Sequence, residues 1–496
     1  MRWADYIYYL SCLFIEAVAV TELHTSTVHL LEGLVTESLA FEDLSRFLLS
    51  EELRLKKHIA EFEAATSVPP WHDDPLTKFF FASRLGGYQE KLTKAAVGGG
   101  YDEILRTLLD SETFWTWWPM GSDLIGASEG LCKLQQVYDV PVQQMISMRS
   151  DLLPPPTPDD FKDVARGCFV EGPFGNTSTW SIAALRRMRQ WTNVLPPHRR
   201  KFRMGIESLL ANDIRRLALR PSENITTYPL PPSNDMLQHK SICVRSGDVW
   251  PLQSDLVCEY SVNGGHPYLL LQPLKVEFLS YDPRIAVIHD VLRPSECEII
   301  RNMGAKNLAR GTIYSEEDPS GVHSPLRVSK VSWLSDDEHP LLAKLATRIG
   351  AATRLSLESA ELYQVANYGL GGHYTPHPDA KSLDDRADDA LVEEIDGNRL
   401  ATVLLFLSDV PAGGATAFVD PPMAVKPRVG DALFWFNLRP YVGDGWPQYF
   451  DFWHEKRILD ERTWHTGCPV LRGSKWIATK WIHERGNVRV DYDVPS

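Results

Sequence analysis

The spacing of hydrophobic positions changes along the chain. From Thr25 to Glu63, apolar residues recur every three or four positions, which is the pattern of one buried face on amphipathic helices. Pro69-Pro70 interrupts this pattern, and helical spacing returns over Leu76–Leu92 and Tyr101–Leu109. We predict that residues 20–150 form an N-terminal helical region, which serves as a scaffold or as an assembly and dimerisation surface.

A proline-rich connector ends this region. The segment Pro154–Pro158 favours a stiff, extended backbone, so it predicts a domain boundary. Pro158 is well placed to begin a helix that continues through Phe169, because proline is tolerated in the first helical turn. Helical spacing over Trp180–Arg189 and Phe202–Leu217 predicts two more helices. We expect residues 158–234 to form a small helical domain.

Beyond Lys240 the pattern becomes that of a β-rich module. Short runs of Val, Ile, Leu, Phe and Trp are separated by Gly, Pro and Asp, and one predicted helix, Pro294–Leu308, interrupts them. The predicted strands are Ala286–His289, Leu362–Tyr368, Arg399–Leu407, Ala415–Phe418, Asp431–Phe436 and Lys475–Ile482. The predicted fold class is therefore α+β and multidomain, with helical regions before a β-rich domain over residues 240–486.

The start of the chain has the pattern of a secretory signal peptide. An apolar run, Ile7–Ile15, follows Arg2 and leads to Ala17-Val18-Ala19, so residues 1–19 are predicted to be removed. The alternative is a buried helix or a membrane anchor, but the run is shorter than the roughly 20 residues that span a bilayer. We predict no membrane span in the rest of the chain. Asn176 and Asn224 begin Asn-x-Ser/Thr sequons and are candidate glycosylation sites.

Net charge and cysteine content argue against two classes of protein, nucleic-acid-binding proteins and disulfide scaffolds. With 51 basic and 65 acidic residues the net charge is −14, which argues against nucleic acid as a partner. Removal of the signal peptide leaves six of the 7 cysteines, too few for a disulfide scaffold. Cys243 and Cys258 enclose a short polar loop and are the predicted disulfide, and the alternative is that all six are buried free thiols.

His377 and Asp379 are candidate metal ligands. Side chains two residues apart on an extended segment point to the same face, and His465 on a neighbouring strand can complete a two-histidine, one-carboxylate triad. Such a triad leaves iron positions open for a cosubstrate and oxygen. A second His-x-Asp pattern, His72-Asp73-Asp74, lies in the helical region, where neither the later histidine nor the β-rich setting accompanies it.

Lys475 is a candidate binding residue for an anion. It begins a predicted strand ten residues after His465, and a lysine buried there requires an opposite charge, such as a dicarboxylate cosubstrate that chelates the iron. The alternatives are a surface lysine on an edge strand, or the same role for Lys480. Tyr368 precedes the metal pair and either donates a hydrogen bond to the same carboxylate or packs as an ordinary aromatic residue.

Several of these segments together resemble the catalytic domain of collagen prolyl 4-hydroxylase α subunits. The resemblance covers about Ile285–Gly486 and is carried by Leu362–Asp379, Asn398–Phe418 and Lys475–Gly486. It implies a double-stranded β-helix, or jelly roll, with His377, Asp379 and His465 as Fe(II) ligands and with Lys475 and Tyr368 at 2-oxoglutarate.

The same resemblance implies the reaction and its setting. It implies hydroxylation of peptidyl proline at C4 with O₂ and 2-oxoglutarate, with release of succinate and CO₂ and with ascorbate as the reductant. It further implies a location in the endoplasmic reticulum lumen and assembly with protein disulfide isomerase as a β subunit. A non-catalytic collagen-binding subunit, or a hydroxylase acting on another proline-rich protein, are the alternatives.

Upstream, the resemblance is weaker and the departures define further expectations. Asp159–Gln190 is similar to the first helical pair of the family's peptide-binding domain, with Phe169 and Phe174 at the usual tyrosine positions and Trp180 retained, whereas its second half is shortened. We expect weak binding of proline-rich peptides there, or else a plain helical core.

Four further features take their expectations from the resemblance. Glu129–Asp139 fits a packed helix, and the Cys243 and Cys258 pair matches a family disulfide position. Cys468 lacks the family's partner cysteine near the C-terminus and is expected to be a free thiol. The loop Arg439–Arg462 is longer than usual and is expected to pack down rather than to cover the active-site mouth.

Overall fold

The computed structural model describes part of the chain. The described residues are 121–147, 156–170, 176–190, 233–246, 256–315, 318–322, 326–382, 396–441 and 457–487, together with residues 76, 79, 200, 201, 203–205 and 208. All of them belong to one compact unit, His72–Ser496. The predicted signal peptide, the helices before residue 76, His72-Asp73-Asp74, Phe174 and Asn224 lie outside the described residues.

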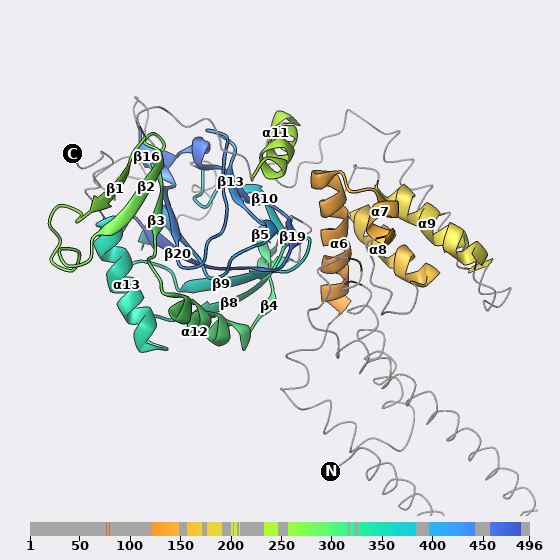
Figure 1. Cartoon of the computed structure of the whole chain (residues 1–496), viewed down its shortest axis with the longest axis horizontal. Coiled ribbons are helices and arrows are strands. Elements are labelled where there is room, and N and C mark those ends of the chain that lie inside the picture. The colour runs from red at the N-terminus through yellow and green to blue at the C-terminus, as the bar shows by residue number, and fades with distance from the viewer. Residues whose placement is uncertain are drawn as a thin grey trace, which may run out of the picture. The chain divides into compact units, whose positions relative to one another are not determined.

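The larger of two main sheets has nine strands, and every pair within it is antiparallel (Figure 1). In spatial order its strands are β1 (Cys258–Ser261), β2 (Leu274–Ser280), β3 (Ile285–His289), β15 (Ala432–Phe436), β11 (Arg399–Phe406), β20 (Lys475–His483), β9 (Tyr363–Tyr368), β8 (Lys330–Leu334) and β4 (Ala309–Arg310). β20 comes last in the sequence but lies inside the sheet, between β11 and β9.

A five-stranded sheet faces it. In spatial order its strands are β14 (Met423–Val425), β13 (Thr416–Phe418), β18 (His465–Gly467), β10 (His373–His377) and β7 (Arg327–Val328). Short two-stranded pairs complete the β structure of the described residues: β5 (Ile313–Ser315) with β6 (Asp318–Val322), β12 (Ala412–Gly413) with β19 (Val470–Arg472), and β16 (Leu438–Pro440) with β17 (Arg457–Leu459). Two facing antiparallel sheets are consistent with the expected jelly roll.

The burial of β11 shows how the large sheet is covered on both faces. Ala401, Val403 and Leu405 contribute to the core shared with helices α12 (Pro294–Ala305) and α13 (Pro340–Thr353). Leu404 and Phe406, which point the opposite way, contribute to the core on the other face, together with Phe418 of the small sheet. Because side chains alternate along a strand, a strand between two such layers is apolar almost throughout.

The six predicted strands and the predicted helix over residues 294–308 are confirmed, with ends that differ by at most three residues. The structure adds elements that the sequence pattern did not predict, among them α13, β10 and α11 (Ser233–Val244). β10 lies in the segment that was expected to be extended, but its short run of mixed polar residues gives no strand pattern of its own. Among the described residues no helix is long and apolar enough to cross a membrane.

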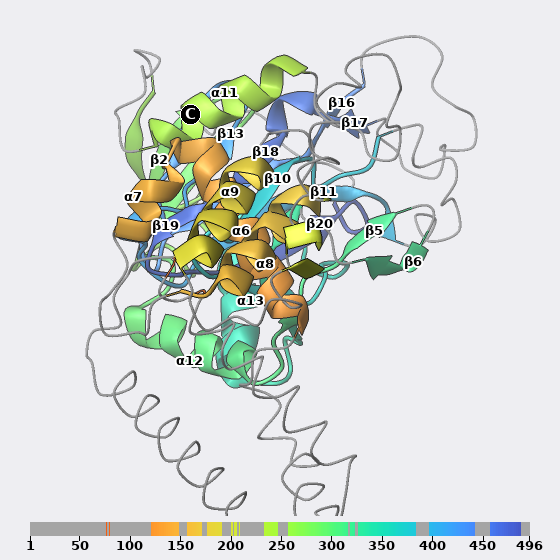
Figure 2. The same ribbon diagram turned by 90° about the vertical axis from the view of Figure 1, so that its right-hand side faces the viewer.

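Four helices form a module next to the sheets: α6 (Gly121–Tyr138), α7 (Val142–Ser147), α8 (Pro158–Val170) and α9 (Asn176–Gln190) (Figure 2). α6 contains the helix expected over Glu129–Asp139, and it also contacts the β domain. Its Tyr138 hydroxyl donates to the Pro469 carbonyl at 2.8 Å, and its Glu129 forms a buried ion pair with Arg310. Because burial outweighs the attraction of Arg310, the pKa of Glu129 is raised.

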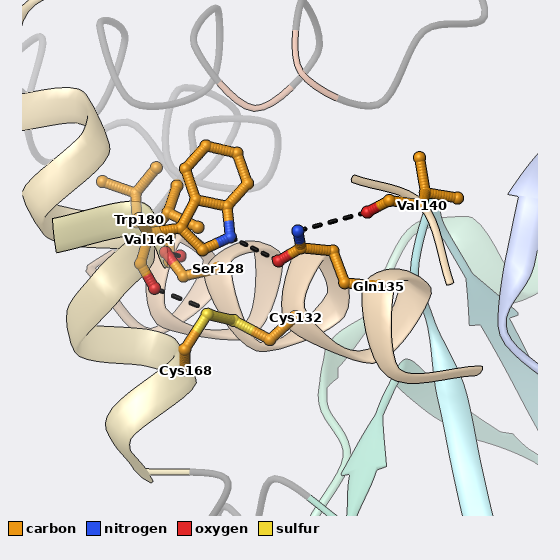
Figure 3. Close-up of a disulfide and its surroundings, with 8 residues drawn as sticks. Ser128, Cys132, Gln135, Val140, Val164, Cys168 and Trp180 are labelled. Carbon is orange, nitrogen blue, oxygen red and sulfur yellow. Dashed lines mark hydrogen bonds between the residues drawn. A yellow bond between two sulfur atoms is a disulfide. The ribbon is translucent and has the colours of Figure 1, made fainter. Parts of the chain in front are cut away.

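Trp180 is a core residue of this module, which corrects the prediction that it lines a peptide groove (Figure 3). Its side chain is 0% exposed and packs against Phe161, with ring centroids 5.9 Å apart. Its indole N–H donates to the amide oxygen of Gln135 on α6. A ring that is enclosed and whose only donor is satisfied internally has no surface to offer a peptide. Phe169 lies in α8, but its side chain is outside the described residues.

Trp180→Ala is expected to destabilise the helical module by about 3–5 kcal/mol, because it leaves a cavity and an unpaired Gln135 amide. Hydrogen exchange followed by mass spectrometry measures this locally: amides of α8 and α9 should exchange faster, while those of α13 in the β domain serve as the internal reference. Trp180→Phe, which keeps most of the volume, should show a smaller effect. Unchanged protection of α8 and α9 in the alanine variant would contradict the core assignment.

The disulfides differ from the prediction. Cys243 bonds to Cys468, at a sequence separation of 225, and Cys132 of α6 bonds to Cys168 of α8 (Figure 3). The predicted Cys243–Cys258 bond is therefore wrong, and so is the expectation that Cys468 is a free thiol. Cys243 is buried on α11 facing the small sheet, whereas Cys258 is exposed on the edge strand β1. Closeness in sequence suggested the short loop, but the fold brings the distant cysteine into bonding range.

Candidate active site

Three predicted ligands meet between the sheets. His377 ends β10, Asp379 follows two residues later, and His465 begins β18, where it pairs directly with His377. Their ligand atoms all lie within 4.8 Å of one another. His465 Nε2 is 3.6 Å from Asp379 Oδ2. All three line a cavity of about 250 Å³, so the expected convergence of His377, Asp379 and His465 is what the fold produces.

Both histidines present the same ring nitrogen to the cavity. His377 Nδ1 lies 2.7 Å from the Thr375 carbonyl, and His465 Nδ1 lies 3.0 Å from the Thr463 carbonyl. A carbonyl only accepts, so each Nδ1 carries a hydrogen, and in the neutral form of each ring Nε2 has a free lone pair. Burial, reinforced by the neighbouring His465, lowers the pKa of His377 to about 3, so that its ring stays neutral. Neutral, oriented imidazoles are the form that binds metal.

Asp379 is held in its charged form. Burial alone would raise its pKa, but His465, His377 and Arg399, with a hydrogen bond from Thr402, lower it below the ordinary value. Thr402 Oγ1 donates to Asp379 Oδ2 at 2.7 Å and accepts from the Asn437 amide at 2.9 Å. Thr402 was not predicted as a site residue. Its signal in the sequence is one polar residue in the apolar run Leu400–Phe406.

The donor set fits a ferrous ion. Two imidazoles and one carboxylate on one side of a cavity match the arrangement that non-haem Fe(II) oxygenases use, with the remaining positions open to other ligands. The histidines donate to backbone carbonyls and Asp379 accepts from Thr402, and these hydrogen bonds provide the outer support that such sites need.

Lys475 lies in the same cavity and has no acidic partner among the described residues. It is 2% exposed, and its ammonium donates to Thr416 Oγ1 at 2.9 Å. Burial lowers its pKa to about 7. A buried cation with a hydroxyl beside it and no anion fits the carboxylate of a ligand such as 2-oxoglutarate. Thr416 is a second site residue that the sequence did not single out.

The competing lysine has another role. Lys480 Nζ lies 2.8 Å from Asp336 Oδ1 and 4.2 Å from the centre of the Tyr363 ring, and Lys480 does not line the cavity. Its charge is therefore already neutralised. Tyr368 lines the cavity and pairs with Lys475 across β9 and β20, with its ring centre 5.8 Å from the ammonium. The fold thus favours Lys475 over Lys480 for binding an anion.

The pKa of Lys475 predicts a pH dependence for cosubstrate binding. The ordinary lysine pKa is well above 7. With a pKa of about 7, the Lys475 ammonium of the ligand-free protein loses its charge as the pH rises through neutrality. The dissociation constant for 2-oxoglutarate should then increase by up to about tenfold per pH unit above 7. Anaerobic titrations at pH 6.5 and pH 8.5 with metal present test this. Lys475→Arg, which stays charged, should remove the dependence, and equal affinities in the unaltered chain would contradict the prediction.

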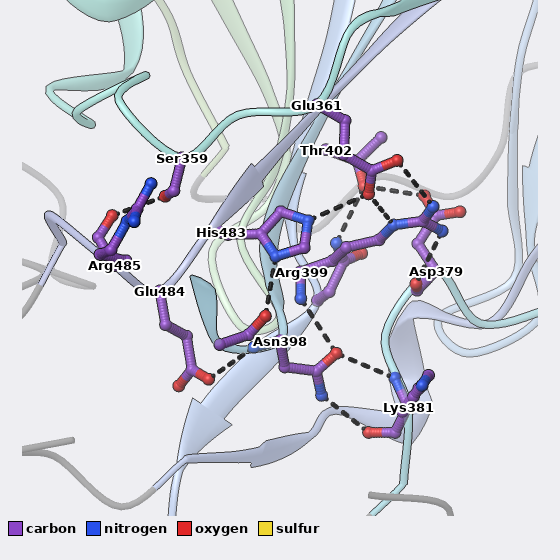
Figure 4. A network of polar contacts seen from close by, with 12 residues as sticks. Ser359, Glu361, Asp379, Lys381, Asn398, Arg399, Thr402, His483, Glu484 and Arg485 are labelled. Atoms are coloured by element: carbon purple, nitrogen blue, oxygen red, sulfur yellow. Dashed lines mark hydrogen bonds and ion pairs between the residues drawn. The ribbon is translucent and has the colours of Figure 1, made fainter. Parts of the chain in front are cut away.

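A network of polar contacts joins Glu361, Arg399 and His483 beside the cavity (Figure 4). Glu361 accepts two hydrogen bonds from the Arg399 guanidinium and one from His483 Nε2 at 3.0 Å. Arg399 in turn reaches the Asp379 carbonyl at 3.3 Å and lies 3.9 Å from the centre of the Trp481 ring. These charges lower the pKa of Glu361 even though its burial opposes this. Arg399 and Trp481 both line the cavity.

The longer loop before His465 is only partly described. Its two ends form the antiparallel pair β16 and β17, and Arg457 of β17 is buried. Residues 442–456 lie outside the described residues, so the expected packing of this loop stays a prediction. The sequons are likewise untested: Asn176 is the first residue of α9, and its side chain is not described.

Comparison with known proteins finds a family match within the β domain. Residues 363–483 match the family model described as the 2OG-Fe(II) oxygenase superfamily. A solved structure of a viral collagen prolyl hydroxylase from Paramecium Bursaria Chlorella virus-1, in complex with 2OG, is 26% identical, covering 40% of this chain and 95% of that chain with a TM-score of 0.31. The segment that matches this family model contains His377, Asp379, His465 and Lys475.

The curated relatives are subunits of prolyl 4-hydroxylases. Prolyl 4-hydroxylase subunit alpha-2 of Gallus gallus is 41% identical over 47% of this chain and 40% of its own length. Prolyl 4-hydroxylase subunit alpha-1 of Homo sapiens is 28% identical over 98% of both chains. The match to the chicken protein thus spans about two-fifths of that relative, whereas the match to the human protein extends over nearly all of it. The chain is therefore similar to prolyl 4-hydroxylase α subunits, most strongly over a part that covers 47% of it and more weakly over nearly its whole length.

Proposed function

We propose that the chain is the catalytic α subunit of a prolyl 4-hydroxylase, which hydroxylates peptidyl proline at C4 in collagen-like or other proline-rich proteins. The reaction consumes O₂ and 2-oxoglutarate and releases succinate and CO₂. The observation that carries this proposal is that one cavity holds His377, Asp379 and His465 together with the buried, anion-free Lys475. The names of the relatives support proline as the group that is modified.

Each side chain has a role in this proposal. His377 and His465 bind Fe(II) through Nε2, and Asp379 binds it through its carboxylate, which Thr402 orients. Lys475 and Thr416 hold the distal carboxylate of 2-oxoglutarate, and Tyr368 lies beside it. When bound, the iron supplies the activation of O₂ and the oxidation of the proline C–H bond. The chain itself orients both substrates and encloses the site.

The proposed setting is the lumen of the endoplasmic reticulum. Residues 1–19 are removed there, ascorbate is the reductant, and protein disulfide isomerase is the β subunit of a hetero-oligomer. Two disulfides among the described residues are compatible with an oxidising compartment. Phe169 and Phe174 remain proposed peptide contacts in residues 158–234, without Trp180. Because the shortened domain offers a smaller groove, the rate of turnover depends only weakly on the length of the peptide.

The test is incubation of the purified chain, with its β subunit if it requires one, with Fe(II), 2-oxoglutarate, ascorbate and Pro-Pro-Gly repeats. Mass spectrometry should show an added oxygen on proline, and fragmentation with a 4-hydroxyproline standard should assign it to C4. Parallel reactions with non-collagen proline-rich peptides distinguish the two substrate classes. Metal binding without oxygen transfer to any proline-containing peptide would instead favour a non-catalytic subunit.

A further inference from the structure

Helix α11 packs against the small sheet, next to β13 and β14 (Figures 1 and 2). Two of its residues four positions apart, and therefore on one face, reach β18 and the residue after it. His239 Nε2 lies 3.0 Å from Thr466 Oγ1, and Cys243 forms the disulfide with Cys468. All four side chains are buried. Alternation along the strand directs Thr466 and Cys468 towards α11, while His465 points into the cavity.

Thr466 lies at an irregularity between the two strands that carry the histidines. Tyr374 of β10 pairs with Gly467 of β18, and His377 pairs with His465, with a register shift between them. Two residues of β10, the second of which is Pro376, therefore face the single residue Thr466. This is a β-bulge, a device that redirects side chains near functional sites. Pro376 has no N–H to donate to the ladder.

The Thr466 hydroxyl provides a side-chain bond across this bulge. Its Oγ1 donates to the Tyr374 carbonyl at 2.7 Å. Because the hydroxyl has a single hydrogen, the ring nitrogen of His239 must be the donor in their contact. Burial, together with the nearby Lys133, lowers the pKa of His239 to about 3, so its ring is neutral and has one N–H to give.

This chain of hydrogen bonds ends beside a candidate iron ligand. The Tyr374 ring stacks on the His377 ring, with centroids 3.5 Å apart, and the His377 and His465 rings are 4.4 Å apart. The His239 N–H therefore donates to the Thr466 hydroxyl, which donates to the Tyr374 carbonyl. These two hydrogen bonds connect α11 to β18 and β18 to β10. The disulfide one turn further along α11 fixes the distance between His239 and β18.

We infer that His239 is a positioning residue of the iron site, which acts through Thr466 to hold the bulge that sets His377 opposite His465. This inference rests on the proposed function, because it assigns His239 a part in the same metal site. His239 does not touch the metal or either substrate. Its effect is on the relative placement of the two histidines, and hence on metal affinity and coordination geometry.

The experiment measures the binding of Co(II) to the full chain, purified without metal, without peptide and without oxygen, with its β subunit if it requires one. His239→Ala should weaken Co(II) binding by about 10- to 100-fold, as loss of an outer hydrogen-bond partner does, and should alter the visible absorption of the bound ion. His239→Gln, whose amide nitrogen can take the place of Nε2, should restore both. A gel under non-reducing conditions confirms that the Cys243–Cys468 bond is retained.

A matched variant separates positioning from simple destabilisation. Ile242 lies on the same helix and is buried in the cluster with Ala417 and Cys468, but it does not contact Thr466 through a hydrogen bond. Ile242→Ala should lower the melting temperature at least as much as His239→Ala, while Co(II) affinity and spectrum stay those of the unaltered chain. Equal weakening of binding in both alanine variants, unchanged binding in His239→Ala, or no rescue by glutamine would overturn the inference.

The outcome is separable from that of the proposed function. If the unaltered chain binds Co(II) in the cavity but never hydroxylates proline, the proposed function fails and the role of His239 can still be measured. If the unaltered chain hydroxylates proline and His239→Ala binds metal normally, the inference alone fails.

Discussion

A chain with His465→Ala is expected to form no detectable hydroxyproline. His465 supplies one of three protein ligands, and loss of even an outer partner of a ligand typically costs 10- to 100-fold in metal affinity or activity, so loss of the ligand itself should cost more than about 100-fold. The ring also packs against Trp435, with centroids 4.7 Å apart, so a modest loss of stability accompanies the change. Hydroxyproline is measured by mass spectrometry, and metal content by elemental analysis.

The control removes a histidine elsewhere. His266 lies outside the cavity, where its ring accepts a hydrogen bond from the Tyr268 backbone N–H. His266→Ala should keep turnover and metal content close to those of the unaltered chain. Circular dichroism of both variants should match the unaltered chain. Full turnover in a folded His465→Ala variant would show that the third ligand is a different residue.

Lys475→Ala is expected to raise the concentration of 2-oxoglutarate needed for half-maximal turnover by about tenfold to a hundredfold. The distal carboxylate loses a charge-assisted hydrogen bond in a buried place, worth roughly 1.5 to 3 kcal/mol. Bound Fe(II) should be affected much less, since Lys475 is not among the metal-binding side chains. Initial rates at a series of 2-oxoglutarate concentrations, with peptide and iron saturating, measure the change.

Lys480→Met is the matched control. Lys480 is the other buried lysine of β20, and its partner Asp336 is partly exposed and can be solvated after the change. This variant should need the same 2-oxoglutarate concentration as the unaltered chain, although its stability falls. An unchanged requirement in Lys475→Ala, or a larger effect in Lys480→Met, would move the carboxylate site away from Lys475.

The sequence predicted the strands at the centre of the fold because those strands are buried on both faces. Residues 399–407 form a largely apolar run of strand length, and residues 475–482 are rich in Trp and Ile. Both patterns can be recognised without knowing the neighbouring strands. β10 and β18 carry the histidines, but both strands are short and contain few apolar residues. The site was therefore predicted from the His-x-Asp spacing rather than from a hydrophobic pattern. The α11 helix follows a proline-rich segment and has only weak helical periodicity, and it was missed.

The cysteine pairing and the supporting residues of the site depend on contacts between distant segments. Cys243 and Cys468 are 225 residues apart, and nothing in the sequence distinguishes Cys468 from Cys258 as the partner. Thr402, Thr416 and His239 act through side chains on other elements, which a linear pattern does not contain. Trp180 shows the reverse problem, because an aromatic residue that fits a groove fits a core equally well.

The place of β20 in the large sheet has a consequence for biosynthesis. Although Lys475–His483 comes last of the described strands in the sequence, it is hydrogen-bonded on both sides, to β11 and to β9. Until it has been synthesised, both of those strands have an open edge of unpaired N–H and C=O groups, which is a template for association with other chains. The large sheet therefore cannot close before β20 has been made, and we expect chains that lack β20 to associate with one another more readily than the full chain.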